Sequence, residues 1–214
     1  MLNFFEKIKE YRHMLWLLLW PLILFLFFYI EKTVEAKYIV YSSWDDLIPF
    51  VDWFIIPYGS WYFYLMAGFI LLGIFSKKDF LHLCMLVYSG HIVCYIFYLL
   101  FPNGQDLRPV ISGTGMFSTL IQNLYAVDTP TNVFPSLHVY DAIAVYVSSR
   151  EYLKKHKHYF LLGASFAVMI LASLSTIFVK QHSILDIFGA IPLFVILYFL
   201  VVKVNRRFFR ETEA

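Results

Sequence analysis

Apolar residues form long unbroken stretches in this chain, and polar residues collect in the short segments between them. A helix that crosses a bilayer needs about 20 apolar residues. Five stretches reach that length, at Met14–Ile30 and at about Pro57–Phe75, Phe80–Phe101, His158–Phe178 and Ser183–Val204. A sixth, Ser136–Ser149, contains His138 and Asp141 and spans only if its helix begins in the preceding loop. We therefore predict an all-α fold, a bundle of six transmembrane helices in a single domain, residues 1–214.

The segment after the first stretch, KYIVYSSWDDLIPFVDWFIIP, mixes apolar and acidic residues and is typical of a helix or loop at the membrane interface. The first stretch could also be a signal peptide, because Lys7, Lys9 and Arg12 precede it. Its 17 bulky residues exceed the usual core of roughly 7 to 15 residues. An uncleaved membrane anchor is therefore the preferred interpretation.

Composition supports a membrane protein. Of the 214 residues, 60% are hydrophobic and only 15% are charged, against about 25% charged residues in soluble domains. Disorder, a secreted disulfide scaffold and a nucleic-acid-binding module are excluded on this basis. Cys84 and Cys94 would stand about 15 Å apart on one helix and cannot pair there. The lipid bilayer is the expected partner, and no pattern indicates an oligomeric state.

The basic residues predict the orientation. With six crossings, the N-terminus, the turn at 76–79, the loop at 150–157 and the C-terminal tail share one side and hold 13 of the 17 Lys and Arg residues. The other side holds only Lys32, Lys37, Arg108 and Lys180. The positive-inside rule places both termini in the cytoplasm. The expected location is the plasma (inner) membrane.

The predicted outer side carries three polar segments, NGQDLRP, TNVFPSLHVYD and STIFVKQHSILD. Ionisable groups near membrane depth mark functional sites. In the last segment, His182 and Asp186 are spaced i, i+4, which stacks their side chains on one helix face. The carboxylate can hold one imidazole nitrogen as N–H and leave the other free to attack. His182 is thus a candidate nucleophile.

The other two segments, together with Lys180 of the last one, supply candidate phosphate ligands. The helix start at Ser136 and Leu137 follows a proline, and such starts bind phosphate through backbone N–H groups. Arg108 offers a planar fork of donors, and Lys180 lies two residues before His182. His138 could protonate a departing oxygen. Together these residues predict a phosphoryl-transfer site.

Other interpretations stay open. A His and Asp pair at i, i+4 is often only structural, and Asp141 either holds the His138 tautomer or belongs to a polar network. His138, Asp141, His182 and Asp186 also form a possible zinc set. Buried polar residues further occur in small membrane transporters, although paired broken helices are lacking here.

The three segments resemble the motifs of the type 2 phosphatidic acid phosphatase superfamily, to which sphingomyelin and inositol phosphorylceramide synthases belong. The family pattern KxxxxxxRP, PSGH and SRxxxxxHxxxD reads here FPNGQDLRP, PSLH and STIFVKQHSILD. The resemblance implies a six-helix core with an extracytoplasmic active site and no metal or other cofactor. It also implies that His182 forms a phosphohistidine, Asp186 orients it and His138 protonates the leaving group.

Two motif cations are replaced in this chain. Phe101 stands where the family has lysine, and Thr176 where it has arginine. Lys180 is a candidate substitute, and fewer cations favour a phosphodiester, which carries one negative charge, over a monoester with nearly two. We predict a lipid phosphatase, with water as the acceptor. The alternative is a lipid head-group phosphotransferase.

Overall fold

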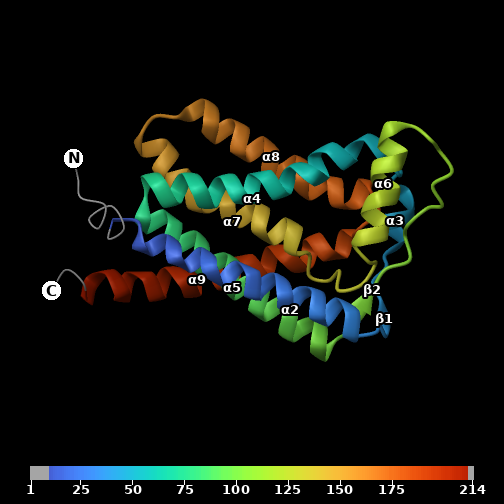
Figure 1. Ribbon diagram of the computed structural model, residues 1–214, viewed down its shortest axis with the longest axis horizontal. Coiled ribbons are helices and arrows are strands. Elements are labelled where there is room, and N and C mark those ends of the chain that lie inside the picture. Colours follow the sequence, from blue (N-terminus) through green and yellow to red (C-terminus); the bar gives the residue numbers. More distant parts are fainter. Residues whose placement is uncertain (1–9, 212–214) are drawn as a thin grey trace.

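The computed structural model describes residues 10–211 and is mostly helical. Helices suit such apolar segments because they satisfy their backbone hydrogen bonds internally, as a bilayer demands. Figure 1 shows the long helices running side by side along one axis. The elements in chain order are η1 Arg12–Leu19, α2 Trp20–Thr33, β1 Tyr38–Ile39, α3 Ser43–Leu47, η2 Asp52–Phe54, α4 Ile55–Phe75, α5 Lys77–Leu100, β2 Asn103–Gly104, α6 Met116–Val127, α7 Leu137–Lys155, α8 Tyr159–Phe178 and α9 Ile184–Glu211.

Within the described residues, five helical segments are long and apolar enough to cross a membrane. They are Arg12–Thr33, Asp52–Phe75, Lys77–Leu100, Tyr159–Phe178 and Ile184–Val204. Each corresponds to one of the five long apolar stretches. The prediction of a helical integral membrane protein is confirmed at this level.

The sixth predicted stretch forms α7, which begins at Leu137 directly after its N-cap, Ser136. The six-crossing count requires this helix to begin in the preceding loop, and this expectation is wrong. The helix extends forward to Lys155 instead. By length and apolarity alone it is not a membrane-spanning candidate in the described part of the chain. Its polar residues are sheltered because α7 packs against α4, α5, α8 and α9.

The packing of α7 against α5 is especially close at Gly90. A Cβ atom there would lie 2.2 Å from the Tyr140 ring, so only glycine fits. The Tyr140 hydroxyl crosses the same contact and donates to the Leu86 carbonyl over 2.9 Å. These contacts fix the position of α7, which carries His138, relative to α5.

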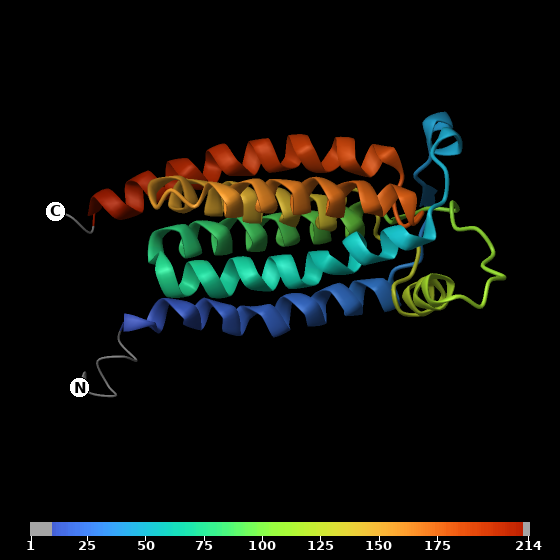
Figure 2. The same cartoon turned by 90° about the horizontal axis from the view of Figure 1, so that it is seen from above.

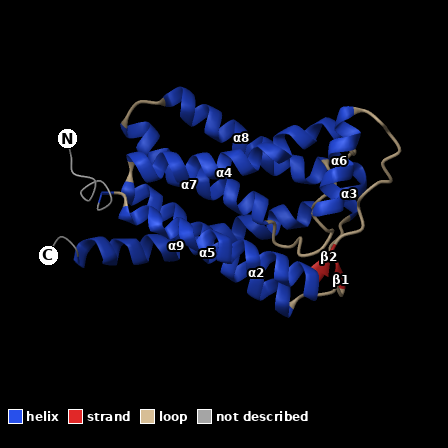
Figure 3. Ribbon diagram, in the orientation of Figure 1, coloured by secondary structure: helices blue, strands red, loops and turns tan. Residues whose placement is uncertain are grey.

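The two ends of the bundle differ. Figures 1 and 2 show η1 and the end of α9 at one end, and α3, α6 and both strands at the other. The strands pair in parallel, with Tyr38 opposite Asn103 (Figure 3). The segment predicted to be interfacial contains β1, α3 and η2, whereas α6 was not predicted. Lys7 and Lys9, on which part of the predicted orientation depends, lie outside the described residues.

Candidate active site

His182 precedes α9, which begins at Ile184, and its side chain meets that of Asp186 in the first turn of this helix. The pair therefore does not share one helix face as predicted, because only Asp186 is helical. The Nδ1 atom of His182 lies 2.8 Å from Asp186 Oδ2 and 3.0 Å from the Val133 carbonyl oxygen. A carbonyl oxygen only accepts hydrogen bonds, so Nδ1 carries the proton. In the neutral ring, Nε2 then holds the lone pair that a nucleophile needs.

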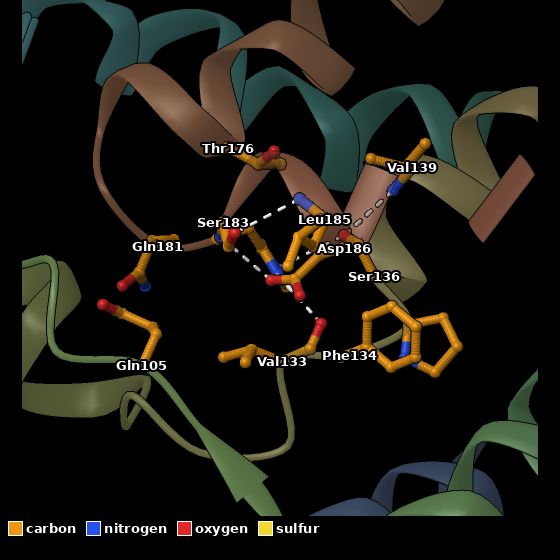
Figure 4. Close-up of polar contacts among 12 residues, drawn as sticks. Gln105, Val133, Phe134, Ser136, Val139, Thr176, Gln181, Ser183, Leu185 and Asp186 are labelled. Atoms are coloured by element: carbon orange, nitrogen blue, oxygen red, sulfur yellow. Dashed lines mark hydrogen bonds and ion pairs between the residues drawn. The ribbon is translucent and has the colours of Figure 1, made fainter. Parts of the chain in front are cut away.

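Several backbone contacts hold this pair rigidly. The Ser183 N–H donates to Asp186 Oδ2 over 3.0 Å, as Figure 4 shows. The Thr176 carbonyl accepts the His182 N–H over 3.1 Å. The Ser136 N–H donates to the Asp186 carbonyl over 3.3 Å, which joins the start of α7 to that of α9. The second Asp186 oxygen, Oδ1, is buried without a partner.

His138 lies beside His182 in an aromatic setting. Its ring centroid is 4.2 Å from that of Trp61, 4.7 Å from that of Tyr58 and 5.8 Å from that of His182. Its Nε2 atom is buried and has no hydrogen-bond partner. On the same side, the Ser136 hydroxyl oxygen lies 3.4 Å from His182 Nε2. The structure thus brings together His182, Asp186, His138 and Ser136.

The two histidines line one cavity of about 150 Å³, together with Leu137. The cavity is also lined by the carboxylate residues Asp128 and Glu31. Neither acid belongs to a motif, and so the sequence analysis missed both. In the described part of the chain, no Lys or Arg lines this cavity.

Asp128 is the acid whose charge interacts with that of His182. Its Oδ2 atom accepts the Tyr58 hydroxyl over 2.9 Å and the Gln181 amide over 3.0 Å. Burial raises the pKa of Asp128 above its ordinary value, and the hydrogen bond from Tyr58 and the charge of His182 oppose this shift. Protonation of this carboxylate would reduce the electrostatic repulsion between the cavity and an anion.

Arg108 lies behind Asp128 and does not line the cavity. Its guanidinium donates to the Asp128 carbonyl over 2.6 Å and to the Tyr125 carbonyl over 3.3 Å. The guanidinium carbon also stacks 4.4 Å above the Tyr125 ring. Arg108 thus contacts the lining of the cavity through the backbone carbonyl of Asp128.

Lys180 points elsewhere. Its ammonium group donates to the carbonyl oxygens of Asp45, over 2.7 Å, and Ile48, over 2.6 Å. Burial lowers its pKa, while the nearby charges of Asp45 and Asp46 oppose the shift. The structure therefore does not bring Lys180 to the two histidines, and its geometry gives no support to the hypothesis that it replaces a motif cation.

The two positions that lack motif cations have structural contacts. Phe101 stacks on Tyr38, with ring centroids 4.2 Å apart. Thr176 is fully buried, and its hydroxyl donates to the Ser173 carbonyl over 2.8 Å. Neither side chain offers a charge to a phosphate.

Asn103 was missed because an asparagine after a proline looks like an ordinary turn residue. Its side-chain oxygen accepts the N–H groups of Val133, over 3.0 Å, and Phe134, over 2.8 Å. Its amide group donates to the carbonyls of Phe101 and Phe134. Asn103 therefore fixes the loop whose Val133 carbonyl holds His182.

Asp45 was also missed, because it lies in the segment predicted to be interfacial. Its carboxylate accepts the Ser183 hydroxyl over 2.6 Å and the Ile184 N–H over 2.8 Å. A carboxylate at a helix start stabilises the helix. Asp45 thus anchors the beginning of α9 beside His182.

Asp141 pairs with His91 and not with the catalytic candidates. The Asp141 Oδ2 atom lies 3.6 Å from His91 Nε2, while His91 Nδ1 donates to the Val87 carbonyl over 2.9 Å. The four residues of the possible zinc set are thus divided, and no group of three or more potential ligands is found in the described residues.

Comparisons with protein-family models, with curated proteins and with solved structures gave no match. The class of protein is defined by the fold alone, as a helical integral membrane protein. Its chemistry has to be argued from the geometry of the histidine site.

Proposed function

We propose that this protein is a membrane lipid phosphatase that cleaves a phosphoester through a phosphohistidine at His182. The observation that carries the proposal is the fixed tautomer of His182. Asp186 and Val133 hold its Nδ1–H, which leaves Nε2 to act as the nucleophile, and His182 lines the same cavity as a second histidine, His138. An oriented, unprotonated imidazole nitrogen is a competent nucleophile.

In the first step, His182 Nε2 attacks phosphorus and the bond from phosphorus to the lipid oxygen breaks. Protonated His138 gives its proton to that leaving oxygen, so that a lipid alcohol departs. The phosphorylated imidazole keeps its Nδ1–H and becomes cationic. Asp186, 2.8 Å from Nδ1, stabilises this charge.

In the second step, a water molecule attacks phosphorus while neutral His138 accepts one of its protons. The bond between phosphorus and nitrogen breaks, phosphate leaves, and both histidines return to their initial states. The backbone N–H groups in the first turn of α7, next to Ser136, are suitable donors to the phosphate oxygens. The proposal uses no metal ion and no other cofactor.

Transfer of a phosphorylated head group to a lipid alcohol is the second candidate function. It is favoured by the charges around the cavity, where Asp128 and Glu31 are present and, in the described residues, Lys and Arg are not. A monoester with nearly two negative charges is repelled more strongly here than a diester with one. Both candidates share the first step and differ in the acceptor.

The proposal includes the six-crossing topology, with α7 as the buried sixth helix, whose length comes from its extension to Lys155 and not from the preceding loop. It places the histidine site at the extracytoplasmic face of the plasma membrane, because the four basic residues of that side are outnumbered by 13 on the other. The grouping of α3, α6 and both strands at one end of the bundle is consistent with this arrangement.

The test is release of phosphate from phosphatidate, phosphatidylglycerol phosphate and polyprenyl diphosphate by detergent-purified protein in chelator. His182→Ala serves as the blank. His156→Ala is the matched control, because His156 is exposed and follows α7 at the opposite end of the bundle. We expect release by the parent protein and the control only, whereas release by the blank at the parent's rate would contradict the proposal. If no monoester reacts, labelled phospholipid with an acceptor alcohol tests the second candidate.

A further inference from the structure

The cavity that the two histidines line extends between α2, α4 and α5, and we call this apolar part the α2–α4 passage. Besides the histidines, it is lined by one face of α2, by Trp61 of α4 and by Tyr95 of α5. The α2 residues recur at helical spacing, which places them on one side of that helix. They are Trp20, Leu24, Phe27, Phe28 and Glu31. This wall extends about 16 Å along the helix axis.

The passage exists because α2 and α4 pack on other helices more than on each other. The main helical partner of α2 is α5, whereas α4 packs against α5, α7 and α8. Figure 1 shows α2 and α4 diverging toward the end that carries the strands and α6. The space between them lies over the face of α5 that carries His91 and Tyr95.

Hydrogen bonds between α2 and the loop that joins α6 to α7 cross the outer end of the passage. Glu31, near the end of α2, accepts hydrogen bonds from the Thr129 backbone N–H over 3.0 Å and from its hydroxyl over 2.7 Å. Thr129 belongs to the loop between α6 and α7. The polar end of the cavity is thus partly closed toward the outer loops, while its apolar wall lies within the membrane-spanning length of α2.

We propose that the α2–α4 passage binds one acyl chain of the lipid substrate and admits it sideways from the bilayer. This inference rests on the proposed function, since the chain belongs to the lipid whose phosphate meets His182. An apolar wall that continues into a polar catalytic end matches an amphipathic lipid. Leu22 and Phe25 of α2 do not line the passage and are exposed, so in a bilayer they would contact the surrounding lipid.

Leu24→Trp tests the passage by filling it, and Phe25→Trp is the matched control on the outward side of α2. We expect Leu24→Trp to raise KM roughly tenfold for a long-chain lipid substrate, through the lost burial of chain methylenes. For a water-soluble short-chain analogue with the same head group, KM should stay within about twofold of the parent value. Phe25→Trp should leave both unchanged. Equal effects of Leu24→Trp on both substrates, or no effect on either, would overturn the inference.

A second measurement needs no turnover and so separates this inference from the proposed function. A phospholipid with a photoreactive group in its acyl chain is incorporated into vesicles with the His182→Ala protein, and labelled residues are mapped by mass spectrometry. Trp61 and Tyr95 are buried, so only a chain inside the passage can label them. Labelling there supports the inference even if no phosphoester is ever cleaved. Labelling confined to outward residues such as Leu22 and Phe25 would overturn it, even if the enzyme is active.

Discussion

Asp186→Asn is the most informative single substitution at the site. It replaces the carboxylate that lies 2.8 Å from His182 Nδ1 with an uncharged group of the same shape. The Val133 carbonyl, 3.0 Å from the same nitrogen, remains as an acceptor. We therefore expect His182 to keep its Nδ1–H tautomer and to lose only the negative charge that stabilises its cationic, phosphorylated form.

The size of the effect follows from the charges. Two unit charges about 4 Å apart interact by about 4 kcal/mol at an effective dielectric constant near 20. Each 1.36 kcal/mol changes a rate about tenfold, so phosphoenzyme formation should slow by about 10³-fold. KM should change little, because the charge develops only as the intermediate forms.

The assay is single-turnover phosphoenzyme formation measured by rapid quench with labelled substrate. Asp45→Asn is the comparison variant, since Asp45 anchors the start of α9 through Ser183 and Ile184 without touching His182. Asp45→Asn should lower the Tm of the protein and leave the rate of phosphoenzyme formation close to that of the parent. A rate for Asp186→Asn within tenfold of the parent would refute the charge argument and reduce Asp186 to a structural role.

Three further results are expected. Burial raises the pKa of Asp128, so its carboxyl group is neutral at low pH and ionises as pH rises. The KM for an anionic substrate should therefore rise with pH, and Asp128→Asn should flatten this dependence. An unchanged KM profile in the variant would show that Asp128 is not the titrating group. Lys180→Met removes a buried ammonium group from two carbonyls and should lower the free energy of unfolding by roughly 2 kcal/mol, a fall of about 4–8 °C in Tm, with KM unchanged. A raised KM at unchanged Tm would instead support phosphate binding by Lys180. Excess chelator should leave turnover unchanged, and strong inhibition reversed by added zinc would favour the metal interpretation.

The helices were predictable because each apolar stretch has one stable arrangement in a bilayer. The five long stretches therefore appear as helices with only small shifts of their ends. The sixth was harder, since α7 is sheltered by neighbouring helices and can keep His138 and Asp141 within a short apolar run. The helix α6 is short and amphipathic, so its sequence contains no long apolar stretch that would predict it.

The site was predictable where the spacing is local. His182 and Asp186 are four residues apart, so they stay close even though His182 precedes α9, which begins at Ile184. The directions of Arg108 and Lys180 depend on distant partners, the carbonyls of Asp128 and Asp45, and no sequence pattern encodes such contacts. For the same reason Asn103 and Asp128 escaped notice, although both are hydrogen-bonded parts of the site.

The most direct test of the central claim is to trap the covalent intermediate. The protein is mixed with substrate labelled in its phosphorus, quenched in alkali, digested and analysed by mass spectrometry. We predict an acid-labile, alkali-stable phosphoryl group on His182, absent from His182→Ala and present in His156→Ala. Turnover of the substrate with no label on the protein, or label on a residue other than His182, would contradict the account.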